Sequence, residues 1–486
     1  MKCNFKSLKT AICFCLAILI AQICTVQTCG AYSVLTHEEI VDLTWKDTLL
    51  PLLKKRFPAA TDDDLKKAHA FAYGGSVMQD MGYYPFGSKY FSDLTHYVRS
   101  GDFVIYLLKE SSDLDEYAFA LGALAHYSAD NCGHPTVNQA VAIEFPKLRK
   151  KYGNVVTYED NPKAHIRTEF GFDVTQVAKG RYTSDAYHYF IGFEISKPVL
   201  ERAFQDTYGI PLTDILSKED LAIGTFRRAI STVIPEMTRV ALVARRQEIV
   251  SETPNFKARQ FRYYLSRANY QKEWGRSYKR PGFGTRLLAF FVRFMPKIGP
   301  FKALDFKIPT QKTEDLYIAS VDKTVQDYTK RLHETSAGDL QLTNTDFDTG
   351  HETRAGEYRL TDSTYAHLLD QLAQHNFDKI TSELRANILA FYADPGAPIA
   401  TKKDRKAWKK TEDELAKLRA LPNPSPAIQP AARDDSETPT PVRTSGIRVR
   451  PWTNILKTCA IKIVKPAGRS TSMLVLTTGS VESRRA

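Results

Sequence analysis

Histidines and carboxylates recur at four-residue spacing between residues 126 and 169. His126, Asp130 and His134 follow one another in this way, and His165 and Glu169 repeat the interval further along. On a helix, residues four apart project from one face, so an imidazole and a carboxylate can reach the same ion. Imidazole nitrogen together with carboxylate oxygen suits zinc, and a ligand set without cysteine argues against a purely structural ion. The spacing therefore predicts a catalytic metal centre.

Three further candidate ligands lie upstream of this stretch. His37 and His96 supply imidazoles, and Asp80 supplies a carboxylate within the glycine-rich segment 74–82, which we interpret as a turn. Asp93, three residues before His96, is the main rival of Asp80. Any one of these histidines would more often be a hydrogen-bonded core residue. Burying the whole set unpaired would be very costly, so we interpret the set as metal ligands.

The elements that must position these residues are expected to be helices throughout 32–250. Thr36 and Glu39 are spaced as a capping box, and a second helix should open at 61–64. Later helical patterns cover 194–204 and 218–250.

Two helices carry the spaced ligands. The first is expected over 114–131 and should stop at Gly133 and Pro135, which leaves His134 just past its end. The second should begin at Asn161, where a capping side chain precedes a proline at the first helical position, and should carry His165.

The N-terminus has the pattern of an export signal. Three lysines precede the apolar run 11–24, and small residues suit cleavage between Ala31 and Tyr32. The alternative, an uncleaved anchor, requires a longer apolar run. Five of the seven cysteines lie before this position, so the mature chain has no disulfide framework. We expect residues 1–31 to be a signal peptide and the protein to be secreted or periplasmic.

The order of the candidate ligands is informative beyond their types. Over residues 32–205 the order is His, Asp, His, His-xxx-Asp, His and His-xxx-Glu. This order resembles that of the zinc-dependent phospholipase C family, which includes bacterial phosphatidylcholine-hydrolysing enzymes and clostridial alpha-toxin. The resemblance implies an all-α fold, a multi-helix bundle of the phospholipase C and single-strand nuclease type, around a site of three zinc ions.

The resemblance also implies how the ligands are shared among the ions. The first zinc would be held by Asp80, His96, His126 and Asp130, the second by His134, His165 and Glu169, and the third by His37, a bridging Asp130 and the backbone of Tyr32 as the mature N-terminus. Family members usually begin with Trp, so Tyr32 is a departure that backbone ligation tolerates. Asp80 would also orient or deprotonate the attacking water.

Several activities fit this chemistry. The resemblance favours a phospholipase C that releases diacylglycerol and a phosphorylated head group. A single-strand-specific zinc nuclease is the first alternative, but its second zinc site characteristically ends in His-xxx-Asp, whereas this chain has Glu169. A glycosylphosphatidylinositol-type phospholipase D shares the domain type. A zinc-dependent lipid-surface binding protein without turnover is the alternative outside catalysis. No cofactor other than zinc and no protein partner is inferred.

The rest of the chain suggests the partner. The formal net charge of +12 favours anionic partners, either a phospholipid surface or, under the alternative, nucleic acid. Residues 257–307 are basic with interleaved apolar residues, most clearly in 286–293, which suits a helix on an anionic membrane or one packed on the core. We therefore expect a catalytic domain over 32–250, a basic, mainly helical region over 251–395 and a proline-rich, disordered tail over 396–486.

Overall fold

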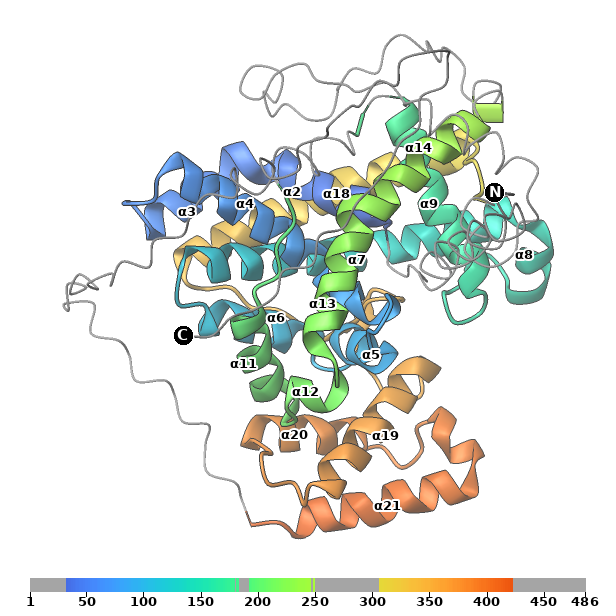
Figure 1. Cartoon of the computed structure of the whole chain (residues 1–486). Helices are drawn as coiled ribbons and strands as arrows, with labels where there is room; N and C mark the ends of the chain where they lie inside the picture. Colours follow the sequence, from blue (N-terminus) through green and yellow to red (C-terminus); the bar gives the residue numbers. More distant parts are fainter. Residues whose placement is uncertain (1–31, 180, 183–191, 246–247, 250–305, 423–486) are drawn as a thin grey trace, which may run out of the picture. The chain divides into compact units, whose positions relative to one another are not determined.

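The computed structural model describes residues 32–179, 181–182, 192–245, 248–249 and 306–422 (Figure 1). Within these residues the chain is helical, and the strands are two residues long: β1 (Thr345–Asp346) pairs antiparallel with β2 (His351–Glu352). The predictions of an all-α fold and of a mainly helical C-terminal region are confirmed. None of the described helices combines the length and apolarity needed to cross a bilayer.

The described residues contain α-helices and short 3-10 and π-helices. In chain order they are α2 (Val34–Thr44), η1 (Trp45–Leu49), α3 (Leu50–Arg56), α4 (Asp62–Val77), η2 (Met78–Tyr83), α5 (Lys89–Tyr97), α6 (Ser100–Glu110), α7 (Leu114–Glu144), α8 (Pro146–Tyr152), α9 (Pro162–Ala178), α11 (Lys197–Tyr208), α12 (Leu212–Ile215), α13 (Glu219–Arg228), η4 (Ala229–Val233), α14 (Ile234–Ala244), α18 (Gln311–Ala337), α19 (Arg359–Gln374), α20 (Ser382–Phe391), η6 (Ala400–Lys403) and α21 (Arg405–Ala420).

Helix α7 is the central element, and it packs against both α4 and α18 (Figure 1). Asp113 caps its first turn, because the Asp113 side chain accepts a hydrogen bond from the backbone N–H of Glu116. The expected stop near Pro135 is wrong, because the helix runs on to Glu144. A proline removes one helical hydrogen bond, but Val137 and other apolar residues of the following turns are buried, and this packing outweighs the loss.

The glycines before Asp80 serve helix packing rather than a turn. Gly75 lies inside α4, and Asp80 follows in the 3-10 helix η2. A Cβ atom at Gly75 would lie 1.9 Å from the backbone oxygen of Phe119, and one at Gly122 would lie 2.1 Å from that of Ala72. Only glycine lets α4 and α7 approach so closely.

The predicted helix starts differ in outcome. Thr61 and Asp64 form a reciprocal capping box, and Asn161 caps α9 through the N–H of Ala164, as predicted. The capping box at Thr36 is wrong: the N-cap is Ser33, three residues earlier, and Thr36 lies inside α2. The Thr36 hydroxyl instead donates to a distant carboxylate, described below.

The C-terminal region is part of the same contact unit as the N-terminal helices. Helix α18 packs on α7 and α2, and Tyr328 of α18 donates to the backbone oxygen of Leu121 in α7. The described residues between 32 and 422 belong to one compact unit. The boundary predicted at residue 250 therefore does not separate two units, because buried aromatic residues tie α18 to the helices before it. Helix α21 also differs from the expected disordered tail from 396, since Leu415 and Leu418 are buried.

Three expectations fall outside the described residues. These are the signal peptide over 1–31, the basic amphipathic segment 286–293 and the proline-rich tail beyond 422.

Candidate metal centre

Helix α7 presents three of the predicted ligands on one face. His126, Asp130 and His134 are separated by four residues each, and the side chains of all three are buried, with at most 1% exposed. Nε2 of His126 lies 3.1 Å from Oδ2 of Asp130, and Nε2 of His134 lies 3.5 Å from the same oxygen. Because α7 continues past Pro135, His134 is held on the helix and faces Asp130.

The first group of ligand atoms comes from Asp80, His96 and His126, with Asp130 beside them. Nε2 of His96 lies 3.3 Å from Oδ1 of Asp80 and 3.5 Å from Oδ2 of Asp130. The Asp80, His96 and His126 ligand atoms all lie within 4.8 Å of one another. Helices η2, α5 and α7 thus bring together the residues predicted for the first zinc.

Backbone carbonyls orient the two histidines of this group. Nδ1 of His96 is 2.7 Å from the carbonyl oxygen of Ser92, and Nδ1 of His126 is 2.9 Å from that of Ser76. A proton on Nδ1 donated to each carbonyl leaves the Nε2 lone pair free for an ion. The close α4–α7 packing is what brings Ser76 within reach of His126.

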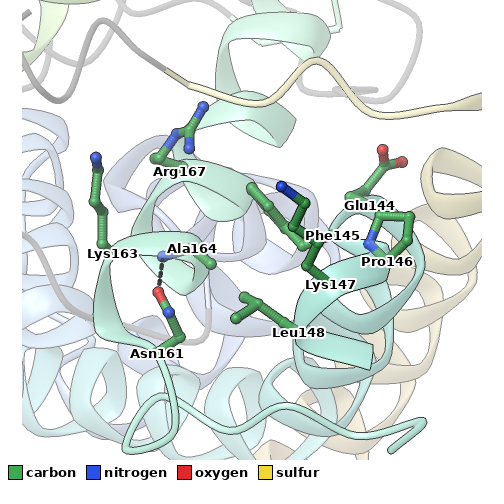
Figure 2. A pocket seen from close by; sticks show the side chains of 9 residues that line it. All are labelled: Glu144, Phe145, Pro146, Lys147, Leu148, Asn161, Lys163, Ala164 and Arg167. Atoms are coloured by element: carbon green, nitrogen blue, oxygen red, sulfur yellow. Dashed lines mark hydrogen bonds between the residues drawn. The ribbon is translucent and has the colours of Figure 1, made fainter. Parts of the chain in front are cut away.

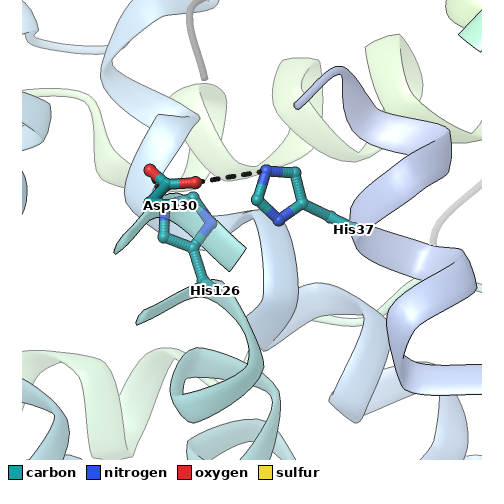
Figure 3. Close-up of side chains that lie close together, drawn as sticks. All are labelled: His37, His126 and Asp130. Atoms are coloured by element: carbon teal, nitrogen blue, oxygen red, sulfur yellow. Dashed lines mark ion pairs between the residues drawn. The ribbon is translucent and has the colours of Figure 1, made fainter. Parts of the chain in front are cut away.

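The third group consists of His37, His126 and Asp130 (Figure 3). His37 projects from α2, and its Nε2 lies 3.6 Å from Oδ1 of Asp130. Its ring stacks on that of His126, with centroids 4.6 Å apart. Oδ1 of Asp130 thus faces His37, whereas Oδ2 faces His96 and His126, so the carboxylate is placed to bridge two ions. The Tyr32 side chain is buried nearby, with its ring centroid 6.1 Å from that of His37.

The second group consists of His134, His165 and Glu169, as the sequence predicted. Nε2 of His165 lies 2.8 Å from Oε1 of Glu169, although the geometry of this approach makes no hydrogen bond. Helix α9 supplies both residues and α7 supplies His134. Asp93 stands apart from all three groups and pairs with Lys89.

The predicted ligands have buried polar atoms without hydrogen-bond partners, as expected of side chains that bind metal ions. Every one of the eight predicted side-chain ligands keeps at least one buried nitrogen or oxygen without a hydrogen-bond partner in the protein; the residues are His37, Asp80, His96, His126, Asp130, His134, His165 and Glu169. Buried polar atoms are rarely left unpaired, since each costs about 1–3 kcal/mol. Cations that accept these lone pairs remove the cost, and the nitrogen and oxygen donor set suits zinc.

The pKa values of the buried ligands shift in different directions. Burial opposes protonation of His96, but Asp130 and Asp80 outweigh it and raise its pKa to about 10. Burial, together with the charge of His126, lowers the pKa of His37 to about 3, and burial lowers the pKa of His165 to about 4. Both imidazoles are therefore neutral at pH 7, as ligation requires. Burial opposes ionisation of Asp130, but the surrounding imidazoles of α7 and His96 outweigh it, so its pKa lies well below the usual range.

Sequence reasoning missed one carboxylate at the centre, Asp348. It follows β1, its side chain is 1% exposed, and its Oδ1 lies 3.4 Å from Nε2 of His134. Its Oδ2 accepts hydrogen bonds from Tyr97 and Tyr358. The separation of more than two hundred residues from His134, and the absence of any periodic pattern around a two-residue strand, left no sequence signal for this contact.

A cavity of about 460 Å³ lies between α7, α8 and α9 and is distinct from the metal centre (Figure 2). Lys163 and Arg167 of α9 line it, together with apolar residues such as Phe145. These two positions are offset by two residues from His165 and Glu169, which corresponds to about 200° around the helix. The cavity therefore lies on the other side of α9, and none of the predicted ligands lines it.

Fold and site together define the class: an all-helical protein built around a candidate multi-metal centre. Residues 36–217 match the family model of zinc dependent phospholipase C. This segment is therefore similar to the zinc-dependent phospholipase C family. No curated relative and no solved structure matches the chain. The matched segment contains all eight predicted side-chain ligands but ends before Asp348.

Proposed function

We propose that this protein is a secreted, zinc-dependent phospholipase C that hydrolyses the phosphodiester bond of phospholipids to diacylglycerol and a phosphorylated head group. The observation that carries the proposal is the centre itself: eight buried ligand side chains with unpartnered atoms lie within a domain of this family. The family supports a phosphodiester hydrolase of the phospholipase C type, and the secretion and the exact reaction are the parts proposed here.

We propose about three zinc ions, one for each group of ligands. Asp130 would bridge the first and third ions, since its two oxygens face different groups. The third ion would also use the amino group of Tyr32, freed by cleavage after Ala31, and the carbonyl oxygen of the same residue. The Tyr32 hydroxyl donates to Ser320 over 2.7 Å, which would hold the new N-terminus beside His37.

Bound zinc would lower the pKa of a coordinated water and neutralise charge on the phosphoryl oxygens. Asp80 is placed to orient the attacking water and to accept its proton, because its Oδ1 has no hydrogen-bond partner and lies at the first group. Burial raises the pKa of Asp80, which makes its carboxylate a stronger base. The backbone carbonyls of Ser76 and Ser92 favour the tautomers of His126 and His96 in which Nδ1 carries the proton and Nε2 carries none.

The proposed partner is a phospholipid membrane or lipid aggregate. Its support is the positive net charge and the basic, apolar segment 286–293. Binding of lipid and of nucleic acid both weaken with salt, so salt dependence does not separate them. Apolar insertion does separate them, because it requires an aggregated substrate.

The test is a side-by-side assay of the secreted, zinc-loaded protein on phosphatidylcholine micelles, phosphatidylinositol, a glycosylphosphatidylinositol-anchored protein, single-stranded DNA and RNA. We expect diacylglycerol release, with a rate that rises when the substrate aggregates. Phe290→Asp should reduce that rise and spare a soluble phosphodiester, whereas Val155→Asp, at an exposed apolar position in the connection between α8 and α9, should not. Cleavage of nucleic acid without lipid turnover would overturn the proposal in favour of a nuclease. N-terminal sequencing of the secreted protein tests cleavage before Tyr32.

A further inference from the structure

Asp348 is a buried carboxylate with one oxygen held and one oxygen free of hydrogen bonds. Tyr97 of α5 and Tyr358 both donate to Oδ2. Oδ1 is buried, has no hydrogen-bond partner and lies 3.4 Å from Nε2 of His134. Leaving a carboxylate oxygen buried and unpaired is costly, so this arrangement calls for a positive charge beside Oδ1.

The separation fits two ligands of one ion. Zinc binds imidazole nitrogen and carboxylate oxygen at about 2.0–2.2 Å, which places adjacent ligands of a tetrahedron about 3.3–3.6 Å apart. The 3.4 Å between Asp348 and His134 falls in this range. So do the 3.3 Å between His96 and Asp80 and the 3.5 Å between His96 and Asp130, which are predicted ligands of the first ion.

The backbone around Asp348 is fixed to the helices that carry the centre. Asn138 of α7 donates through its side-chain amide to the carbonyl oxygen of Asp348 over 2.7 Å. The N–H of Phe347 donates to the carbonyl oxygen of His96 over 3.2 Å. Hydrogen bonds to Oδ2, to the backbone carbonyl of Asp348 and from the backbone of the preceding residue fix the position of this carboxylate. Metal ligands in proteins are held in place in the same way.

We propose that Asp348 is a further protein ligand of the ion that His134 binds, supplied from beyond the matched domain. The inference rests on the proposed metal centre. The second group then has four protein ligands, of which two are carboxylates. Their two negative charges neutralise a divalent zinc ion within the protein. Four protein ligands are the number found in closed zinc sites. A substrate phosphate would then reach this ion only by raising its coordination number, and the first and third ions would carry more of the substrate binding.

The test measures metal binding rather than activity. Zinc content and affinity, by elemental analysis and chelator competition, are compared among the wild type, Asp348→Asn and the control Asp346→Asn. Asp346 is a matched control because it is buried on the same segment, but Thr361 and the N–H of Thr349 donate to its two oxygens. Removal of hydrogen-bonding partners around a metal ligand typically costs 10–100-fold in affinity. We expect Asp348→Asn to weaken the most affected ion by about 100-fold or more and Asp346→Asn by much less.

The outcomes are distinguishable. A wild type without bound zinc would overturn the metal centre and this inference together. If the wild type binds zinc, and the zinc affinity of Asp348→Asn is within about threefold of that of Asp346→Asn, the role of Asp348 alone is overturned. If Asp348→Asn does not fold, a crystal structure of the zinc-loaded wild type decides: an Oδ1 to zinc distance of about 2.0–2.2 Å supports the inference, and a distance beyond about 3 Å overturns it.

Discussion

The contact between Thr36 and Asp173 gives a quantitative test of how the His37 helix is anchored. Thr36 is fully buried, and its hydroxyl donates to Oδ1 of Asp173 in α9 over 2.6 Å. The same hydroxyl lies 2.6 Å from the Tyr317 hydroxyl of α18. Since Thr36 donates to the carboxylate, Tyr317 must donate to Thr36, and Tyr182 in turn to Tyr317. Asp173 also accepts from the N–H of Leu35 over 3.0 Å.

The expected cost follows from the bonds lost. Thr36→Val leaves one carboxylate oxygen short of a donor and the Tyr317 hydroxyl without its acceptor, which should cost about 2–4 kcal/mol of unfolding free energy. Asp173→Asn should cost about 1–3 kcal/mol, because an amide cannot accept at both positions. A hydrogen bond to a charged group contributes about 1.5–3 kcal/mol. The double variant should therefore be less destabilised than the sum of the singles by that amount.

The assay is urea unfolding in the presence of a chelator, with all four proteins compared at pH 8. Burial raises the pKa of Asp173 to about 6, so the carboxyl is ionised at pH 8 and protonated at pH 5. The coupling should fall toward that of a neutral hydrogen bond, about 1 kcal/mol, at pH 5. A coupling below about 0.5 kcal/mol at pH 8, with a large coupling between Thr36→Val and Glu39→Gln instead, would refute the anchor and restore the capping box.

Three further outcomes test the centre and the packing around it. Elemental analysis should find more zinc lost from Asp130→Asn than from Glu169→Gln, because Asp130 faces two groups; equal losses would contradict the bridge. In the chelated protein, His165 should contribute a loss of stability as the pH falls from about 6.5 to 4, because burial lowers its pKa to about 4 in the folded state. This loss should amount to about 3 kcal/mol of unfolding free energy. His165→Gln should remove it from the pH dependence of the urea midpoint. An unchanged slope would contradict the assignment. Gly75→Ala should lower the melting temperature sharply, because its Cβ would lie 1.9 Å from a backbone oxygen of α7, whereas Gly224→Ala, in open space, should gain about 0.5–1 kcal/mol.

Local rules predicted those features that depend on neighbouring residues. The caps at Thr61 and Asn161 need only a side chain and an N–H three residues later, and both form. The pairing of His165 with Glu169 needs only the helical period. The resemblance supplied the order in which distant ligands share ions, and the structure brings those side chains together.

Features that depend on tertiary packing were not predictable in this way. Thr36 has the spacing of a capping box, but burial against Asp173 offers its hydroxyl a charged acceptor. Pro135 has the pattern of a helix stop, but buried neighbours keep α7 helical. In both cases a local signal of about 1–3 kcal/mol competes with contacts from segments far away in the sequence.

The C-terminal region bears on what the functional unit is. The matched domain ends at residue 217, yet Tyr317 donates to the Thr36 hydroxyl, next to His37, and Asp348 lies beside His134. Tyr358 in turn holds the second oxygen of Asp348. Because these contacts are buried, removing the region would leave polar atoms of α2 and α5 without partners as well as exposing the apolar face of α7. The candidate metal centre is therefore enclosed in part by residues that follow the matched segment 36–217.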